Sequence, residues 1–179
     1  MLISTSRKPS SKTRAFCKNL SHALGCEYIN RGKMSMRELQ LKSIESGYKY
    51  ISLVYEMNGN PSKITFFSND GDELVAIIGS VNTTNERLHI KTDDLTFQSD
   101  LPELNILREI FNIDESQVIG SKENFVYIEK LIDNYEDIKD EDIKDEDIED
   151  FEKKIAIIHF YNKYGDDTGL KINLRKIVS

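Results

Sequence analysis

The sequence lacks the features that mark membrane proteins, secreted proteins and proteins stabilised by a structural metal ion. No apolar run approaches the roughly 20 residues that a membrane-spanning helix needs, and the N-terminal MLISTSRKPS has no apolar stretch of the kind found in secretory signals. The two cysteines, Cys17 and Cys26, are too few for a disulfide framework or a structural zinc site. We therefore expect an intracellular, cytoplasmic protein with reduced thiols, no membrane partner, no metal and no cofactor.

Proline and glycine are also sparse, with three Pro and nine Gly in 179 residues. With 39% hydrophobic and 31% charged residues, this composition is typical of a globular protein. The length suits one ordinary domain, or two small lobes that share a core.

The net charge of −7 conceals a strong asymmetry along the chain. Residues 1–50 hold ten Lys and Arg against three Glu, whereas residues 51–132 carry a net charge of −8 and residues 133–152 one of −10. A basic first third can create a local field that attracts anions, whatever the average charge. The acidic total therefore does not exclude a nucleic-acid partner.

The hydrophobic pattern of the first half predicts alternating strands and helices. Helices are expected over about 12–24, with Ser10 or Ser11 as the cap, and from the capping box Ser35–Glu38 to about Ser46. Strands are expected over 2–6, 27–30, 48–56, 63–68 and 73–81.

The second half is predicted to repeat this order less regularly. Its expected strands are 87–92 and 117–120, its helices 101–111 and 124–135, and its closing hairpin 154–162 with 169–178. Alternating helices and strands indicate an α/β protein. We expect two similar halves, about 1–82 and 85–179, within a single domain covering 1–179.

The tract YEDIKDEDIKDEDIEDFEKK repeats isoleucine with a period of five. A five-residue step turns about 140° net around a helix, so Ile138, Ile143 and Ile148 form no single stripe. The composition favours a solvated, low-complexity insertion over about 133–152, either disordered or a fraying helix. The alternative is a calcium site, but the carboxylates lack the glycine and the spacing of an EF-hand loop. In the repeated order, the tract corresponds to the turn at Gly47 in the first half.

Two basic segments, 7–14 and 30–37, directly precede or begin predicted helices. The helix macrodipole favours Asp and Glu at those positions by roughly 0.3–1 kcal/mol each, so helix stability does not explain Lys and Arg there. An external anion does, because free backbone N–H groups and basic side chains together form a phosphate site. If strands 2–6 and 27–30 are parallel, both loops leave one sheet edge and merge into one basic patch. The alternative is a scatter of solvated surface charges.

Catalysis has little support in the sequence. Arg31-Gly32-Lys33 lacks the upstream glycine of a phosphate-binding loop. The three histidines, His22, His89 and His159, have no neighbouring partner in the sequence for a nucleophile or a metal. A binding protein is favoured, with either RNA or acidic protein surfaces as its partner.

The two basic segments resemble the N-terminal signature of the Brix-domain family of ribosome-biogenesis proteins, in its compact archaeal form. The matching residues are T-S-R-K-P-S-x-x-T-R-x-F followed by N-R-G-K-x-S-x-x-E-L, and the similarity continues through the turn Gly59-Asn60-Pro61. It returns in the closing FYNKYGDDTGLKINLRKI, although Gly169-Leu170-Lys171 stands where the family often has Gly-Pro-Arg.

The resemblance implies two similar α/β halves related to the anticodon-binding domain of class II tRNA synthetases, and no enzymatic activity. It implies a factor that binds rRNA or pre-rRNA and assists rRNA processing and subunit assembly, with ribosomal or assembly proteins as further partners. The alternative is a protein-interaction module whose basic patch docks acidic proteins of the same particle. Ser10 and Gly32 also have a purely structural interpretation, as a helix cap and a turn residue. The residues expected to contact RNA are Arg7, Lys8, Ser10, Lys12, Arg14, Asn30, Arg31, Gly32, Lys33 and Arg37.

Overall fold

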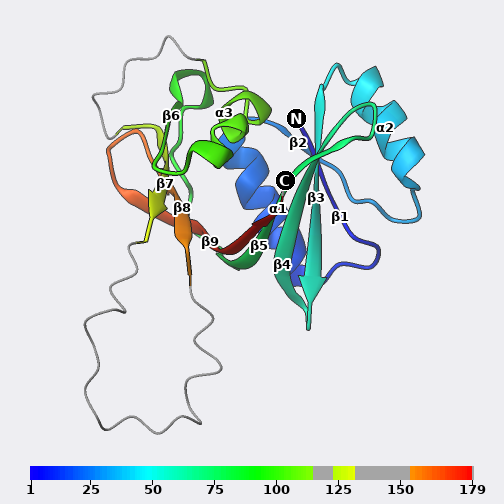
Figure 1. The fold of residues 1–179 in the computed structure, drawn as a ribbon, viewed down its shortest axis with the longest axis horizontal. Coiled ribbons are helices and arrows are strands. Elements are labelled where there is room, and N and C mark those ends of the chain that lie inside the picture. The colour runs from blue at the N-terminus through cyan, green and yellow to red at the C-terminus, as the bar shows by residue number, and fades with distance from the viewer. Residues whose placement is uncertain (115–122, 132–153, 179) are drawn as a thin grey trace, which may run out of the picture.

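The computed structural model describes residues 1–114, 123–131 and 154–178. Within these residues one mixed sheet forms in the order β2-β1-β3-β4-β5-β9-β8-β7-β6 (Figure 1). Its strands are β1 (Leu2–Thr5), β2 (Glu27–Tyr28), β3 (Tyr50–Met57), β4 (Asn60–Ser68), β5 (Glu73–Asn82), β6 (Thr96–Ser99), β7 (Phe125–Lys130), β8 (Ala156–Tyr161) and β9 (Asp167–Val178). The helices are α1 (Ser11–Leu24), α2 (Met36–Glu45) and the short α3 (Ile106–Ile110), with 3-10 turns η1 (Thr92–Asp94) and η2 (Pro102–Leu104).

The sheet contains the same strand order twice. β1 is parallel to β3, after which β3, β4 and β5 pair antiparallel. Likewise β6 is parallel to β7, after which β7, β8 and β9 pair antiparallel. The two series meet where β5 pairs antiparallel with β9, so a two-fold rotation at that junction interchanges them. The expected pair of similar α/β halves is confirmed in the strand order, although β2 and α2 have no counterpart in the described part of the second half.

The junction between the halves is close-fitting. The pairing register shifts between Ile78 and Gly79, and a Cβ added at Gly79 would lie 1.8 Å from the carbonyl oxygen of Asn173. Glycine is needed there because the two backbones approach too closely for any side chain. The side-chain amide of Asn173 adds a hydrogen bond to Oδ1 of Asn82 at 2.9 Å. The sheet is therefore continuous across the two halves.

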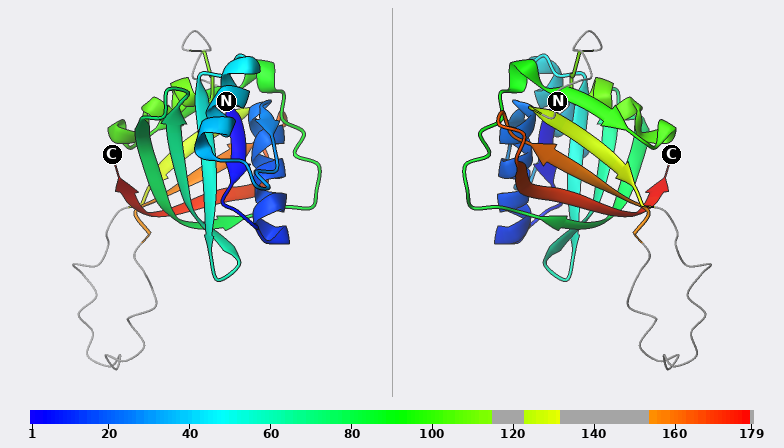
Figure 2. Two further views of the ribbon diagram at one scale, coloured as in Figure 1. Left: turned by 90° about the vertical axis from the view of Figure 1, so that its right-hand side faces the viewer. Right: turned by 90° about the vertical axis from the view of Figure 1, so that its left-hand side faces the viewer.

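α1 and α2 lie on opposite faces of the sheet (Figure 1). The chain runs from β1 through α1 to β2, and then back through α2 past β1 to β3, with all three strands parallel. Right-handed crossovers that proceed in opposite directions place their helices on opposite faces. The sheet curves around α1 (Figure 2), whose Phe16 and Leu20 join a core that includes Phe66 from the first half and Phe160 from the second.

A smaller apolar layer lies under α2. Leu2 pairs with Ile51 across β1 and β3, so both side chains face the same side of the sheet, and Leu39 of α2 is buried with them at 0% exposure. On the equivalent face of the second half, Phe125 and Tyr127 are only partly buried. None of the described helices covers that face, which is turned toward the viewer on the right of Figure 2.

Several predictions for the second half are wrong. Residues 87–91 are irregular rather than a strand, and β6 begins later, at Thr96. The helix predicted over 101–111 is present in part, as the 3-10 turn η2 followed by α3, and it ends before Asn112, which adopts a left-handed conformation (φ 59°). The strand predicted over 117–120 and the tract at 133–152 lie outside the described residues.

The helix predicted over 124–135 is also wrong in its described part, which is β7. Val126 and Ile128 face the core, whereas Phe125 and Tyr127 face outward. Both faces carry apolar residues, which hides the two-residue alternation of a strand, so pairing with β6 and β8 decides the conformation.

The acidic tract occupies a different place in the repeated order from the one expected. The N–H of Leu131 donates to the carbonyl of Ile155 at 3.0 Å, directly beyond the paired ends of β7 and β8. The tract therefore lies within the connection of a β-hairpin. The matching connection in the first half is the Asn58-Gly59 turn between β3 and β4, not the turn at Gly47.

Both cysteines are free, as expected. Burial raises the pKa of the Cys17 thiol to about 12 and that of Cys26 to about 11. The thiolate is the reactive form, and these raised pKa values favour the protonated thiol at neutral pH. Among the described residues, no helix combines the length and apolarity needed to cross a membrane, and no cluster of His, Cys, Asp and Glu is placed to hold a metal ion.

Candidate nucleic-acid interface

The two basic loops leave the same edge of the sheet. β1 and β2 pair in parallel, with Leu2 opposite Glu27 and Ile3 opposite Tyr28. The N–H of Ile29 then donates to the carbonyl of Ile3 at 2.9 Å, which holds the two strand ends together. The β1–α1 and β2–α2 loops therefore begin side by side, and the parallel pairing on which the predicted patch depended is confirmed.

A surface pocket of about 590 Å³ lies between these loops. None of the described residues that line it is acidic. Lys8 has a φ of 55°, a left-handed conformation that is uncommon for residues other than glycine. We call the lining residues the two-loop patch: Arg7, Lys8, Pro9, Arg14, Asn30, Gly32 and Lys33.

Six of the ten predicted residues are thus brought together, and the other four do not line the pocket. Nζ of Lys12 donates to Oδ1 of Asn60 at 3.1 Å, beside a separate groove of about 910 Å³ along the β3–β4 hairpin. Nε of Arg31 donates to the carbonyl of Met34 at 3.1 Å, so Arg31 is engaged within its own loop. Arg37 is exposed in the first turn of α2.

The fourth residue, Ser10, caps α1, and the N-terminus of that helix is satisfied from within the protein. Oγ of Ser10 accepts from the N–H of Thr13 at 3.2 Å. Oε2 of Glu56, from β3, accepts from the hydroxyl of Thr13 at 2.5 Å and from the N–H of Ser10 at 2.9 Å. These two hydrogen bonds hold the pKa of Glu56 below its ordinary value. An internal carboxylate therefore stands where the sequence suggested an external anion.

The N-terminus of α2 is satisfied in the same way, by the predicted capping box. The N–H of Glu38 donates to Oγ of Ser35 at 3.2 Å, and Oε2 of Glu38 accepts from the N–H of Ser35 at 2.7 Å. The bonds from Ser35 lower the pKa of Glu38. Because both helix ends have acceptors inside the protein, the two-loop patch offers basic side chains, rather than helix N–H groups, to a phosphate.

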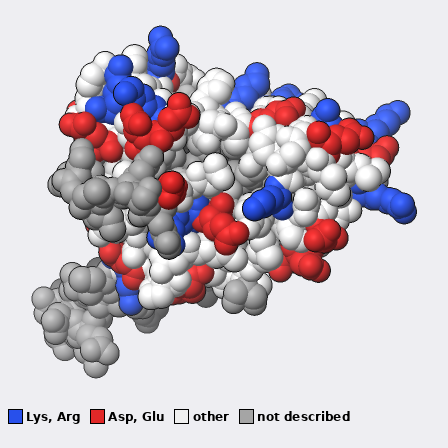
Figure 3. All heavy atoms as spheres, turned by 90° about the horizontal axis from the view of Figure 1, so that it is seen from above, with Lys and Arg blue, Asp and Glu red and all other residues white. Residues whose placement is uncertain are grey.

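Gly32 is a turn residue within the patch. Its φ is 54°, and no atom lies within 4 Å of the position that a Cβ would take. The residue that sequence analysis missed is Glu56, which lies 46 positions from Ser10, so no local pattern connects them. On the face seen from above, acidic and basic side chains are interspersed, and the group of basic side chains at the upper left is bordered by acidic ones (Figure 3).

Comparison with known proteins identifies relatives of this arrangement. No family model matches the sequence. The chain is 45% identical over 73 residues to a probable Brix domain-containing ribosomal biogenesis protein of Methanothermobacter thermautotrophicus, a match that covers 41% of this chain but only 44% of the relative's length. It is 34% identical over 131 residues to a protein of the same description from Methanosarcina mazei, covering 73% of each chain.

Solved structures agree with the sequence matches. The crystal structure of Mil, an archaeal Imp4-like protein, superposes with a TM-score of 0.72 at 26% identity and covers 99% of this chain and 98% of Mil. Together with the Methanosarcina mazei relative, this similarity along the whole sheet confirms the resemblance found in the two basic segments. The chain belongs to the family of Brix domain-containing ribosomal biogenesis proteins.

Proposed function

We propose that this protein is a non-enzymatic, cytoplasmic factor in ribosome biogenesis that binds rRNA or pre-rRNA through the two-loop patch and assists rRNA processing and subunit assembly. The observation that carries the proposal is one pocket surrounded by Arg7, Lys8, Arg14 and Lys33, with no acidic residue among its described lining. Like charges held together repel one another, and a bound anion relieves that repulsion. Family membership supplies the ribosomal context.

The composition of the patch favours contacts to the RNA backbone over base reading. Lys and Arg side chains pair with phosphate oxygens, which position a protein on RNA without selecting its sequence. None of the described residues that line the pocket is aromatic, so it has no ring on which a base can stack. We expect structured rRNA to bind with modest sequence specificity.

The test is a charge reversal at two residues of the patch, Arg14→Glu on α1 with Lys33→Glu on the β2–α2 loop. The double variant should bind several unrelated RNAs more weakly by similar factors. The slope of log K against log salt should also fall, by about 0.7–0.9 for each phosphate that the protein no longer neutralises. Lys42→Glu is the matched control, because Lys42 is an exposed lysine on α2, outside the patch.

Circular dichroism establishes that the variants are folded. Unchanged affinity and salt slope in the folded double variant would contradict the patch assignment. Loss of binding to an acidic polypeptide, with RNA binding unchanged, would instead favour a protein-interaction module.

A further inference from the structure

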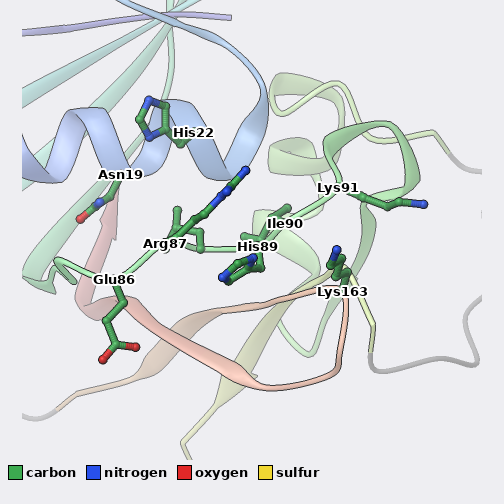
Figure 4. A pocket seen from close by; sticks show the side chains of 9 residues that line it. Asn19, His22, Glu86, Arg87, His89, Ile90, Lys91 and Lys163 are labelled. Atoms are coloured by element: carbon green, nitrogen blue, oxygen red, sulfur yellow. The ribbon is translucent and has the colours of Figure 1, made fainter.

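A second basic pocket, of about 390 Å³, lies near the C-terminal end of α1 (Figure 4). Among the described residues that line it, Glu86 is the one acidic residue, and in Figure 4 its carboxylate points away from the basic side chains. The lining comes from three segments: Asn19 and His22 of α1, residues 86–91 between β5 and β6, and Lys163 of the β8–β9 loop. Both halves of the molecule therefore contribute to it.

The irregular segment that forms the floor of this pocket is held in place at several points. The N–H of Lys163 donates to the carbonyl of His89 at 3.1 Å, and the N–H of Lys91 donates to Oδ1 of Asn124 at 2.8 Å. Leu88 anchors the segment in the core at 8% exposure. The basic side chains on either side of Leu88 are consequently presented to solvent by a fixed backbone.

An exposed aromatic ring, that of Tyr164, lies next to two of the lining residues, His89 and Lys163. Tyr164 is 64% exposed, its ring centroid lies 6.1 Å from that of His89, and Nζ of Lys163 lies 4.9 Å from the tyrosine centroid. The cation lies over a face of the ring. When it pairs with a phosphate, that face becomes available for a base to stack on, so the pair suits a nucleotide. His89 also has a φ of 52°, and strained backbone conformations concentrate at binding sites.

Exposed basic residues on α1 connect this pocket to the two-loop patch. Arg14, Lys18 and His22 are spaced four residues apart, so they lie along one side of the helix, and all three are exposed. Arg14 lines the two-loop patch and His22 lines the second pocket. At 1.5 Å per residue these two positions are about 12 Å apart along the helix axis, a span that one RNA strand can bridge.

We propose that this pocket is a second RNA site, in which Arg87, Lys163 and His22 hold a backbone phosphate while Tyr164 stacks on a neighbouring base. One single-stranded segment then runs from the two-loop patch along α1 into the pocket. Single-stranded RNA fits best, because its bases are free to stack on an exposed ring. The proposal rests on the RNA-binding function proposed above.

The test compares oligouridine with an RNA duplex by fluorescence anisotropy, using the full chain. Arg87→Ala with Lys163→Ala should weaken oligouridine binding by about tenfold and lower the salt slope by about 0.7 for each phosphate left without its cation. Tyr164→Ala should cost about tenfold for oligouridine and little for the duplex, whereas Tyr164→Phe should bind like the wild type. Lys42→Ala is the control for removing a surface lysine. Oligouridine that contains 4-thiouridine should crosslink to the peptide that carries Tyr164.

The outcomes separate this site from the two-loop patch. If Arg14→Glu/Lys33→Glu loses RNA binding while the folded pocket variants bind oligouridine like Lys42→Ala, the second site is wrong and the proposed function stands. If the pocket variants lose binding to polyglutamate but not to RNA, the pocket serves an acidic protein instead. A wild-type protein that binds neither RNA overturns both proposals.

Discussion

The two halves of the sheet share a strand order but differ in what covers them. In the first half, α1 and α2 lie on opposite faces, and the loops that precede them carry the basic patch. In the second half, β7 and β8 bury one face against the core, and the other face, which no described helix covers, carries a row of aromatic side chains. There the ring centroid of Phe125 lies 5.7 Å from the ring centroid of Tyr127 and 5.9 Å from that of Tyr161. The hydroxyl of Tyr127 donates to Asp100, so a carboxylate lies beside these rings.

This difference shows which elements create the candidate site. β1 and β6 are each followed by a helical segment and are each parallel to the next strand of their half. In the first half, β2 adds a further parallel strand and α2 a further helix, and their connection places a second basic loop beside the first. The patch therefore depends on the two elements that have no counterpart in the described second half, rather than on the repeated strand order.

Removing a large side chain of α1 from the core that both halves share should have the largest effect on stability. Phe16 of α1 is fully buried in the core to which both halves contribute. Phe16→Ala should lower the free energy of unfolding by about 3–5 kcal/mol, because it leaves a large cavity. Urea unfolding followed by far-UV circular dichroism and by tyrosine fluorescence measures this, since the chain has no tryptophan.

The matched variant is Leu39→Ala, which opens a cavity under α2 in the first half alone. We expect a loss of about 2–5 kcal/mol. Because the sheet is continuous through β5 and β9, both variants should still unfold in one transition, with the two probes coincident. Two resolved transitions, with only the first weakened by Leu39→Ala, would show that the halves are independent units.

Removing the Glu56 carboxylate from the N-terminal end of α1 should have the next largest effect on stability. Glu56→Ala deletes the carboxylate that accepts hydrogen bonds from Thr13 and Ser10, and should cost about 1–2 kcal/mol. Those bonds lower the pKa of Glu56 from its ordinary 4.5. The stabilisation should therefore be complete above about pH 4.5 and be lost as the pH falls through the lower folded-state pKa. Urea unfolding at several pH values measures this. A difference in the free energy of unfolding between variant and wild type that is the same at pH 3 and pH 7 would contradict this assignment.

The helix ends of the first half could be predicted from the sequence because each depends on residues within a few positions of one another. The cap at Ser10, one of the two candidates, the end of α1 at Leu24 and the capping box of Ser35 and Glu38 all occur where predicted. The second half depends more on contacts between distant segments. Residues 125–130 carry no local signal strong enough to separate a strand from a helix, and strand pairing decides between them.

The candidate site divides in the same way. That the two basic loops meet follows from parallel pairing of β1 with β2, which sequence analysis stated as a condition and the structure shows. That Glu56 occupies the end of α1 could not be predicted, because it depends on the position of β3. The histidines that stand alone in the sequence do not stand alone in the structure: His22 and His89 line one pocket with Lys163, from three separate segments.

Removing one hydroxyl from the open face of the second half should have a small effect. The hydrogen bond from Tyr127 to Oδ2 of Asp100, at 2.7 Å, raises the pKa of Tyr127 to about 12. Tyr127→Phe should cost no more than about 1 kcal/mol at neutral pH, because the bond is exposed. That contribution is present below pH 10 and is lost as the pH rises towards 12.

Tyr50→Phe is the comparison variant, since the hydroxyl of Tyr50 in the first half donates to Glu109 of the second half and that bond raises its pKa. Absorbance titration at alkaline pH should show one late-ionising tyrosine fewer in Tyr127→Phe than in the wild type. If the ionisation that is missing from the variant lies near pH 10 instead, Asp100 does not hold the phenol in its protonated form.

The smallest effect on stability is expected from deleting residues 135–150. This connection and the Asn58-Gly59 turn join equivalent strand pairs, and Leu131 already bonds to Ile155 at the base of the longer one. The deleted residues hold ten acidic residues and two Lys, too little apolar surface to offset the entropy of ordering them. Shortening the loop lowers the entropic cost of closing it by at most about 1 kcal/mol of free energy, so the Tm should be nearly unchanged.

The same deletion should have a larger effect on RNA binding. It changes the net charge from −7 to +1, which removes a field that opposes phosphate at the two-loop patch. Binding to random RNA should strengthen at low salt, and the gain should shrink as salt screens the tract. A full-length variant with every Asp and Glu of 135–150 changed to Asn and Gln separates charge from length, and should reproduce the gain in affinity. A large loss of Tm on deletion would show instead that the tract packs against the second half, which would then be stabilised by its hairpin connection as the first half is by α2.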